Sequence, residues 1–297
     1  MRHLMTFRYV DEVAKTGSMR MASEILSITP SALTRRIQSL EDELGEPIFE
    51  RLTKGVRLTA AGTVLIAHIR NQLSDMERVK SHISDLAGVR RGHISIACSQ
   101  GVLAHFVAPQ INAYRRSHPG VTFSVIARDR SAAEQALHDY SADLALIFEP
   151  IRLVDLKTIS TSPQSICVIM SSRHMLAKKH KLRLKDCVDY PVALPTRPYG
   201  TRYLIEKASA RLGIEFSPAV ETDSFDFLRN LPSSTDVISF HTRLGLPRKK
   251  VHNGMVHRSI DKRDLPAGTL SLVQLNERNL PVATQKFGLQ LAQSLKG

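Results

Sequence analysis

Cysteine is scarce in this chain, with three residues among 297, and the three are far apart. Their odd number, the lack of a Cys-x-x-Cys pair and the lack of histidines at ligand spacing argue against a disulfide framework and against a zinc site. A redox sensor would need two of the thiols to be brought together by the fold. We interpret Cys98, Cys167 and Cys187 instead as buried thiols that pack as small hydrophobic groups.

Long apolar runs and catalytic motifs are also missing. No stretch of about 18 apolar residues is present, and the opening Met-Arg-His-Leu-Met-Thr lacks the apolar core of a signal peptide. We therefore expect a cytoplasmic protein without a membrane partner. The Gly-x-Ser-x-Gly, His-Glu-x-x-His and phosphate-loop motifs are absent, the 12 histidines are scattered, and residues 88–92 form no dinucleotide fingerprint. The sequence argues against an enzyme and predicts no cofactor and no metal.

The composition is that of a globular protein, with 42% hydrophobic and 23% charged residues. The net charge of +13 points toward nucleic acid, but its location matters more than its size. Residues 1–91 carry 14 Lys and Arg against 11 Asp and Glu, whereas residues 92–297 carry 27 against 17. Most of the positive excess lies outside the N-terminal region, and we interpret the basic runs 178–181 and 248–250 as solvated loops.

Two helices separated by a short break are predicted between residues 18 and 45. Ser18 is a candidate N-cap for the first helix. Thr29 and Pro30 are start signals for the second, because a threonine oxygen caps a helix and proline fits the first turn. Gly45 is a stop signal. Apolar residues recur at helical spacing in both: Met21, Ala22, Ile25 and Leu26 in the first, and Leu33, Ile37, Leu40 and Leu44 in the second.

The opposite face of the second helix is polar, and its first half, with Ser31, Thr34, Arg35 and Gln38, contains no carboxylate. Such a face suits the major groove of DNA. Acidic residues 41–43 follow it, so contact is expected only in the N-terminal half. The segments 48–49 and 56–58 then flank a basic tip, which predicts a β-hairpin wing against phosphates. An ordinary helical hairpin with a solvated polar face is the alternative.

A single long helix is predicted from Thr59 to Ala87. This stretch has no proline, and its apolar residues recur at steps of three and four over about 29 residues, or about 43 Å. We interpret it as a dimerisation linker because paired half-sites on DNA require paired readers. Packing on its own domain is the alternative. The apolar stripe consists of Gly62, Leu65, Ile66, Ile69, Leu73, Met76, Val79, Ile83 and Leu86.

Beyond residue 92, strands and helices alternate in the order that predicts an α/β layer with a mainly parallel sheet. A second unit of the same kind follows, and the end of the chain returns to complete the first. The first unit is predicted from strands 93–99, 121–126 and 143–148, helices around 106–114 and at 131–139, and the returning strand 270–273 and helix 282–295. Strand-like runs 156–161 and 165–171 lead into the second unit, with strands at 192–194, near 218–222 and near 236–240, and helix 200–212.

The N-terminal region carries a longer pattern of positions: Phe7, Val10, Gly17, Ser18, Ala22, Leu26, the run 30–37, Leu40, Glu41, Leu44, Gly45, the run 48–51 and the run 58–62. In these residues it resembles the DNA-binding domain of LysR-type transcriptional regulators. The resemblance implies a winged helix-turn-helix at 1–58, a linker helix at 59–89 and, at 90–297, an effector-binding domain of two α/β lobes, like a periplasmic binding protein. Lobe I is expected at about 90–160 and 266–297, and lobe II at about 161–265.

A sequence-specific transcriptional regulator is therefore the leading hypothesis. Its partners would be double-stranded promoter DNA, a small-molecule effector and further copies of itself, as a homodimer or, by the resemblance, a dimer of dimers (a homotetramer). RNA polymerase is a further candidate partner under this hypothesis. Many family members carry glutamine where this chain has Pro30. The predicted DNA-binding residues are Ser18, Thr29, Pro30, Ser31, Thr34, Arg35, Arg36, Gln38, Arg51 and Lys54.

An effector site is expected beyond the carboxyl ends of the strands, near helix N-termini. By the resemblance, family members bind a small effector between the lobes at these loops, and Ser99, Thr201 and Arg202 match best. Arg128, Arg197 and Arg202 together would neutralise a carboxylate, so an anionic effector is predicted. The predicted effector-binding residues are Ser99, Gln100, Gly101, Arg128, Phe148, Thr196, Arg197, Thr201 and Arg202, with Glu149, Tyr199 and Gly200 in the same loops.

Two other classes of protein remain as alternatives. A solute-binding protein for transport would fit residues 92–297 alone, but the helix-turn-helix speaks against it. An architectural DNA binder without an effector would show no ligand-dependent change of its footprint. The leading hypothesis instead has an effector that closes the lobes and thereby changes the spacing of the DNA-reading heads.

Overall fold

The computed structural model describes residues 2–86, 92–233, 236–247, 251–252, 254–276 and 278–296. The chain divides into two compact units, Met1–Ala87 with Arg278–Val282, and Gly88–Glu277 with Ala283–Gly297. The end of the predicted linker at 87–89, the expected domain start at 90 and the basic run 248–250 lie outside the described residues.

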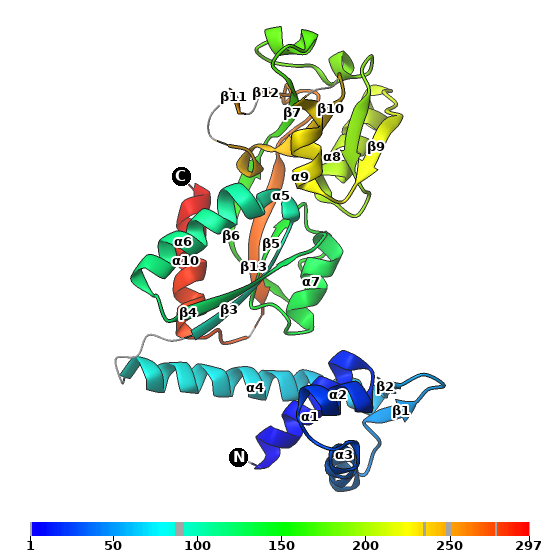
Figure 1. The fold of residues 1–297 in the computed structure, drawn as a ribbon, viewed down its shortest axis with the longest axis vertical. Helices are drawn as coiled ribbons and strands as arrows, with labels where there is room; N and C mark the ends of the chain where they lie inside the picture. The colour runs from blue at the N-terminus through cyan, green and yellow to red at the C-terminus, as the bar shows by residue number, and fades with distance from the viewer. Residues whose placement is uncertain are drawn as a thin grey trace. The chain divides into compact units, whose positions relative to one another are not determined.

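The N-terminal unit is a helix-turn-helix with a β-hairpin and a long helix (Figure 1). Ser18 Oγ accepts a hydrogen bond from Met21 N at 3.3 Å, which confirms the predicted N-cap. At the other end of the motif, Gly45 takes the left-handed conformation, with φ 73°, that lets a helix stop. The elements are α1 (Arg2–Thr16), α2 (Met19–Ile25), α3 (Pro30–Leu44), β1 (Phe49–Arg51), β2 (Val56–Leu58) and α4 (Ala60–Leu86).

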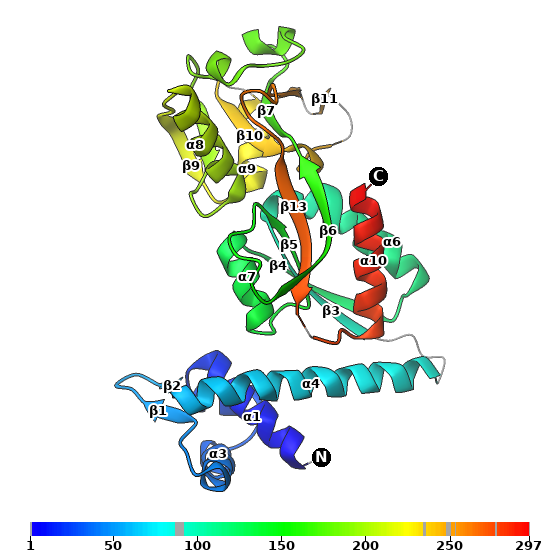
Figure 2. The same ribbon diagram turned by 180° about the vertical axis from the view of Figure 1, so that it is seen from behind.

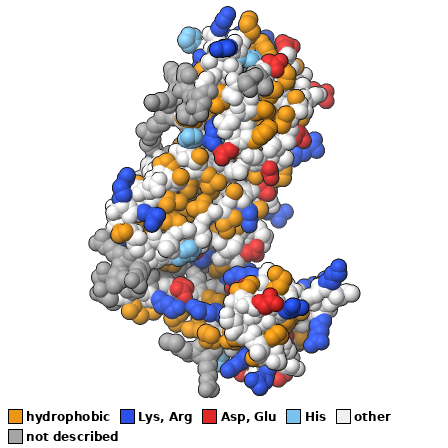
Figure 3. Space-filling view, in the orientation of Figure 1, with side chains coloured by type: hydrophobic (Ala, Val, Ile, Leu, Met, Phe, Trp, Pro, Cys, Tyr) orange, Lys and Arg blue, Asp and Glu red, His pale blue; other side chains and the backbone are white. Residues whose placement is uncertain are grey.

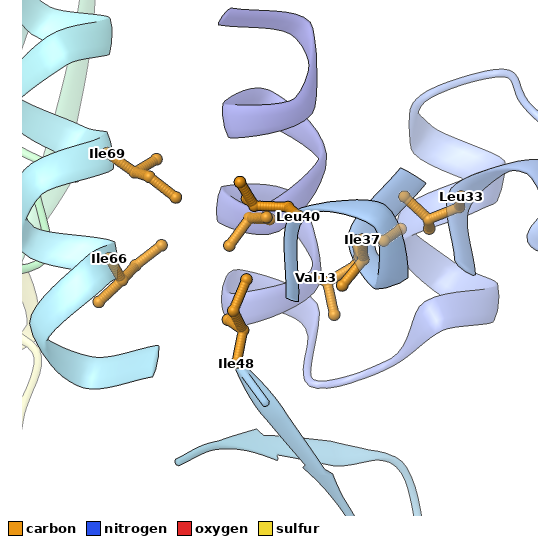
Figure 4. Packing of buried hydrophobic residues seen from close by; sticks show 9 residues of the cluster. Val13, Leu33, Ile37, Leu40, Ile48, Ile66 and Ile69 are labelled. Atoms are coloured by element: carbon orange, nitrogen blue, oxygen red, sulfur yellow. The ribbon is translucent and has the colours of Figure 1, made fainter. Parts of the chain in front are cut away.

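The first helix, α1, is not among the predicted elements. Its Val10 and Val13 are fully buried in the core of the unit, and this i, i+3 pair was the available signal. Figure 4 shows the same core receiving Leu33 and Ile37 from α3 and Ile48 from the start of the hairpin. The core therefore fixes α3 on one side and leaves its other side to solvent.

Three apolar side chains of the two predicted stripes are corrected by the structure, because Met21, Ile25 and Leu44 are exposed. On α2, the residues that face the core are Ala22 and Ser23. Leu44 is the last residue of α3, directly before the left-handed Gly45, and it extends past the core with 47% of its surface exposed. The buried stripe of α3 is thus Leu33, Ile37 and Leu40.

The long helix α4 is 27 residues long, and its two halves differ in burial. Its first half packs on its own domain, where Ile66 and Ile69 are buried against α1 (Figure 4). Farther along, Val79 and Ile83 are 42% and 60% exposed. The single continuous pairing stripe predicted from the sequence is therefore wrong for its first half.

The C-terminal unit contains two sheets with flanking helices, and this two-lobed α/β arrangement confirms the predicted fold class. Lobe I comprises β3 (Gly92–Cys98), α5 (Gln100–Val102), η1 (Leu103–Val107), α6 (Ala108–Ser117), β4 (Val121–Ala127), α7 (Arg130–His138), β5 (Leu144–Phe148), β6 (Leu156–Gln164), β13 (Gly268–Leu275) and α10 (Val282–Lys296). Lobe II comprises β7 (Ile166–Ser171), η2 (Met175–Lys178), η3 (Leu184–Cys187), β8 (Val192–Pro195), α8 (Gly200–Leu212), β9 (Pro218–Thr222), α9 (Phe225–Asn230), η4 (Leu231–Ser233), β10 (Ile238–Thr242), η5 (Arg243–Gly245), β11 (Val251–His252) and β12 (Met255–Ser259).

The lobe I sheet has the order β4-β3-β5-β13-β6, and helices cover both of its faces. Figures 1 and 2 show α6 and α10 on one face and α7 on the other. The first layer is held by an aromatic cluster in which Tyr114 of α6, Phe123 of β4 and Phe287 of α10 meet edge to face. The carboxyl ends of β3, β4 and β5, which run parallel, come together at one edge of the lobe.

The sheets differ from the prediction in three respects. In lobe I, β13 runs antiparallel to both β5 and β6. Strand β6 stays paired with β13 to Gln164, so the lobe boundary lies near residue 165 and not near 160. The lobe II sheet has the order β11-β12-β7-β10-β8-β9, and its β11 and β12 were not predicted.

Candidate functional site

The N-terminal half of α3 presents a polar face to solvent. Ser31, Arg35 and Gln38 are exposed and Thr34 is half-buried, in agreement with the predicted helical spacing. Together with Ser39 and Asp42, these side chains line an open hollow on the outer side of the helix. In the described part of the chain, neither Arg35 nor its exposed neighbour Arg36 forms an ion pair. The face therefore offers hydrogen-bond donors that the protein itself does not occupy.

Two of the predicted DNA-binding hydroxyls already serve as helix caps. Thr29 Oγ1 accepts from Ala32 N at 3.3 Å and lies 3.2 Å from Ser31 Oγ. The Ser18 oxygen is likewise taken by the start of α2. Pro30 is exposed at the first position of α3, where its missing N–H costs no hydrogen bond.

The β1–β2 hairpin holds a basic tip in a fixed position. Val56 N donates to Gly17 O at 2.9 Å, so the hairpin is tied to the turn between α1 and α2. A Cβ on Gly55 would come within 2.3 Å of the same Gly17 oxygen, and its φ is 86°, so only glycine fits there. Arg51 and Lys54 are exposed beside it, and in the described structure neither forms an ion pair.

The wing also carries an arginine that the sequence analysis did not select. Arg57 of β2 lies opposite Glu50 of β1 and forms an ion pair with it. Hydrogen bonding and the charge of Glu50 raise the pKa of Arg57 above its ordinary value. The cross-strand register pairs the two residues, and it becomes readable from the sequence only once the hairpin turn is placed.

A second candidate site lies where the carboxyl ends of the lobe I strands meet lobe II. Of the predicted effector residues, Ser99, Arg128 and Phe148 line a small cavity there. Its volume of about 10 Å³ is about the space that one water molecule fills. The remaining lining residues are Asp129, Arg130, Ala133, Leu146, Ile147, Tyr199 and Gly200.

The lobes touch around this cavity through glycine backbone. A Cβ on Gly200 of lobe II would lie 2.2 Å from the Phe148 carbonyl oxygen of lobe I. A Cβ on Gly245 would likewise lie 1.8 Å from the Gly101 carbonyl oxygen. Such distances are far inside van der Waals contact, so these glycines permit the lobes to approach backbone to backbone. The described conformation is therefore closed at this junction.

A direct hydrogen bond joins the lobes beside these glycines. Gln100 Oε1, in lobe I, accepts from Phe225 N at the start of α9, at 2.6 Å. Gln100 was predicted to bind the effector, and in this conformation its carbonyl oxygen is occupied by lobe II. Gly101 packs against the Phe225 ring. A Cβ on this glycine would lie 3.1 Å from the nearest ring carbon.

The structure does not bring the three predicted cleft arginines together. Arg202 is buried and forms ion pairs with Glu206 and Glu221 at 2.8 and 2.6 Å. Arg197 is 82% exposed and approaches the same Glu206 at 3.4 Å. Only Arg128 lines the cavity, so the predicted cradle of three arginines is corrected: two of them are neutralised by the protein's own carboxylates.

The two hydroxyl residues predicted in lobe II, Thr201 and Thr196, do not line the cavity either. Thr201 is almost fully buried inside the start of α8, whereas Thr196 is half-buried after β8. The lobe II wall of the cavity is formed by Tyr199 and Gly200. Burial raises the pKa of the Tyr199 hydroxyl, which stays protonated and able to donate a hydrogen bond at neutral pH.

Arg130 is a basic cavity residue that the sequence analysis missed. Its guanidinium carbon lies 4.4 Å from the centre of the Tyr203 ring in lobe II, and its Nη1 donates to Glu149 O at 3.2 Å. Its Nε is buried and has no hydrogen-bond partner among the described residues. Asp129 caps α7, so the helix begins at Arg130, whereas the predicted start at residue 131 left this arginine in a loop.

Other reactive groups are inert or absent in the described part of the chain. All three cysteines are free and buried, which confirms the interpretation of the thiols. Burial raises the pKa of Cys98 and of Cys187 to about 12, so both remain protonated. Among these residues, no group of His, Cys, Asp and Glu could hold a metal ion, and no helix has the length and apolarity to cross a membrane.

Both units match known families. Residues 4–63 match the bacterial regulatory helix-turn-helix protein, lysR family, and residues 87–296 match the LysR substrate binding domain. The HTH-type transcriptional activator CmpR of Synechocystis sp. is 24% identical over 227 residues, which cover 76% of this chain and 74% of that protein. A probable nitrogen assimilation transcriptional activator of Synechocystis sp. is 25% identical over 287 residues, covering 94% and 93%. These relatives are named as regulators of transcription and not as enzymes.

Solved structures show the same fold. Full-length OxyR from Pseudomonas aeruginosa, in a variant form, matches with a TM-score of 0.73 at 18% identity, over 99% of this chain and 94% of that chain. CbnR complexed with its target DNA matches with a TM-score of 0.63 at 17% identity, over 98% and 99%. The likeness extends over both the helix-turn-helix and the two lobes.

Proposed function

Because the chain belongs to the LysR family of transcriptional regulators, we propose that it reads promoter DNA with the N-terminal half of α3. The observation that carries the proposal is that Arg35 and Gln38 are exposed and Thr34 is half-buried on one face of the first half of α3, which contains no carboxylate. In the described part of the chain, Arg35 forms no ion pair. Arginine pairs with guanine in the major groove, and glutamine pairs with adenine. Arg36 lies toward the edge of the groove, and Arg51 and Lys54 of the wing hold phosphates.

Replacement of one arginine tests this assignment. Arg35→Ala should weaken binding to the cognate promoter by about 5- to 150-fold, the equivalent of about 1–3 kcal/mol for a lost bidentate base contact. Binding to random DNA should change little. Arg8→Ala, which removes an exposed arginine of α1 that pairs with Glu77, is the matched control. Equal promoter affinity of the two variants in a quantitative gel shift would remove Arg35 from the DNA-reading face.

Two copies of the chain pair, in this proposal, through the outer half of α4. Val79 and Ile83 are apolar, exposed and four residues apart, as an intermolecular helix seam requires. Ile83→Asp should therefore yield monomers in analytical ultracentrifugation with an unchanged helix content. Val64→Asp is the control, because Val64 is exposed on the same helix but lies off the predicted stripe. A dimer that survives Ile83→Asp contradicts this part of the proposal.

The effector, in this proposal, is a small anion bound at the lobe junction by Arg130 and Arg128. A buried donor without a partner is costly, and Arg130 Nε is such a donor at the cavity wall. The described cavity holds about one water, so an effector enters only when the lobes separate. An anion would then bind an open arrangement of lobes in preference to the closed one and shift the population between them, which reverses the effector-driven closure expected from the sequence.

Calorimetric screening of small carboxylates against three variants tests the effector assignment. Arg130→Gln should abolish the binding of any carboxylate that binds the parent protein, and Arg202→Ala should leave it within a factor of about 3, because Arg202 is already neutralised by two glutamates. Arg197→Gln is the control for loss of one exposed positive charge. If Arg202→Ala abolishes binding and Arg130→Gln does not, the originally predicted arginine is correct and Arg130 is not the anion site.

A further inference from the structure

One end of lobe II is strongly basic and is not used by either site described above. Residues 173–189 and 257–264 contain nine Lys and Arg against four Asp, an excess of five. The whole of residues 92–297 has an excess of ten, so half of it comes from these two short segments. In Figure 1 the light green turns that include η2 and η3 lie at the end of lobe II away from lobe I, and Figure 3 shows Lys, Arg and His side chains there, with some Asp and Glu beside them.

The side chains of the basic run 178–181 are exposed, as the interpretation of a solvated loop expects, but the backbone of these segments is held in place. Arg258 donates to the carbonyl oxygens of Ala177 and Lys179 at 2.8 and 2.9 Å. Leu182 and Ile260 form a β-bridge between the two segments. The cations are thus presented from a preorganised surface, which lowers the entropy cost of binding a partner.

Most of the carboxylates in the two segments are already neutralised. Arg183 binds both oxygens of Asp264, at 2.7 and 2.6 Å. Lys179 pairs with Asp186 at 2.9 Å, and Arg263 pairs with Asp261 at 2.9 Å. Asp189 is exposed and is the remaining carboxylate. Four exposed cations in these segments form no ion pair with a described residue: Arg173, Lys178, Lys185 and Lys262.

We propose that these four residues, the lobe II basic surface, bind the phosphate backbone of DNA outside the base pairs read by α3. A cluster of exposed cations gains affinity for a polyanion by releasing its counterions. Lysine binds phosphate well as a point charge, and it is depleted in protein–protein interfaces. Promoter DNA is the polyanion that a regulator of this family binds. The proposal rests on DNA binding and is independent of the effector.

The salt dependence of DNA binding by the full-length protein tests this surface. A triple variant, Lys178→Gln with Lys185→Gln and Lys262→Gln, removes three exposed charges from it. The control variant, Lys157→Gln with Lys286→Gln and Lys296→Gln, removes three exposed charges from lobe I. Both variants should melt at the temperature of the parent protein, because none of the six lysines is buried or ion-paired among the described residues.

The plot of log affinity against log salt concentration, measured on a long promoter fragment, should lose about 2 to 3 units of slope in the lobe II variant, about 0.9 for each phosphate contact removed. The control should keep the slope of the parent. Random DNA of the same length should give the same loss, whereas Arg35→Ala lowers affinity for the cognate promoter alone. Equal slopes for the two triple variants would overturn the proposal. A second outcome would also overturn the proposal: the two triple variants give equal slopes on DNA, but only the lobe II variant is retained more weakly than the parent protein on a polyglutamate column. The partner of the surface would then be an acidic polypeptide.

Discussion

The polar face of α3 and the loops at the lobe junction both contain arginines and hydroxyls, yet the protein uses them differently. On α3, Arg35 and Gln38 lie on the surface without an ion pair in the described structure, four and seven residues after Ser31 on the same helix face. At the lobe junction, Arg202 is buried between two glutamates. The described chain leaves the first surface unoccupied, whereas at the second its own carboxylates neutralise Arg202 and leave Arg130 Nε as a buried donor without a described partner.

This contrast has a physical origin. A helix face is fixed by local geometry, so one segment of sequence decides which side chains share it. The junction is assembled from strand ends and helix starts that are far apart in the chain, and each polar group there finds its nearest partner only after folding. A prediction of a site from loop positions therefore overestimates how many of its charges remain available to a ligand.

An added methyl group at the lobe junction should give the largest loss of unfolding free energy among the variants considered. Gly200→Ala places a Cβ 2.2 Å from the Phe148 carbonyl oxygen, so the lobes must separate or the backbone must shift. We expect a loss of about 3 kcal/mol in unfolding free energy and a wider lobe arrangement in small-angle scattering. Gly288→Ala is the matched control, since its Cβ would meet only ordinary contacts at 3.6–3.9 Å. A Gly200→Ala protein as stable and as compact as the control would contradict the closed junction.

Removal of the buried arginine should give the next largest effect. Arg202→Ala should lower the unfolding free energy by about 2 kcal/mol, since it deletes two charge-assisted hydrogen bonds and leaves Glu206 and Glu221 partly hydrated. Arg197→Ala, at a surface ion pair, should change it by less than about 0.5 kcal/mol. Urea unfolding of both variants measures the difference. If the two residues prove equally dispensable, Arg202 is not a structural arginine.

The pH dependence of stability should show the smallest effect. Burial, with the nearby charges of Arg229, His105 and His257, lowers the pKa of His241 to about 4, from about 6.5 in the unfolded chain. The unfolded state then binds more protons below pH 6.5, so this part of the stability is present above that pH and is lost as the pH falls toward 4. Between pH 7 and 5.5 the loss should be about 1 kcal/mol.

His241→Asn should remove the fall in unfolding free energy between pH 7 and 5.5, whatever the variant's stability at neutral pH. The same slope of unfolding free energy between pH 7 and 5.5 in parent and variant would show that another group titrates there.

The sequence predicted the elements with strong local signals well. The caps at Ser18 and Thr29, the stop at Gly45 and the helix Gly200–Leu212 follow from residue type and spacing, and all are present. Contacts between segments far apart in the chain were harder to predict from the sequence. The short strand β12 depends on pairing with β7, and β11 in turn on pairing with β12. The burial of Ile66 and Ile69 depends on where α1 packs.

At the lobe junction, the sequence analysis missed two ion-pair partners of Arg202, one close to it in sequence and one far from it. The Arg202–Glu206 pair has i, i+4 spacing and was readable from the sequence, and it would have lowered the weight given to Arg202. Its second partner, Glu221, lies on β9 and is brought there only by the fold. Arg130 was missed because its role depends on Tyr203 of the opposite lobe.

Methylation interference on the cognate promoter tests most directly the central claim that Arg35 on α3 reads bases. Methylation at guanine N7 removes a major-groove acceptor that arginine uses. The account predicts one guanine per half-site whose methylation weakens the parent protein but has no effect on Arg35→Ala, while the Arg8→Ala control keeps the parent pattern. The same interference pattern for Arg35→Ala and the parent would contradict it.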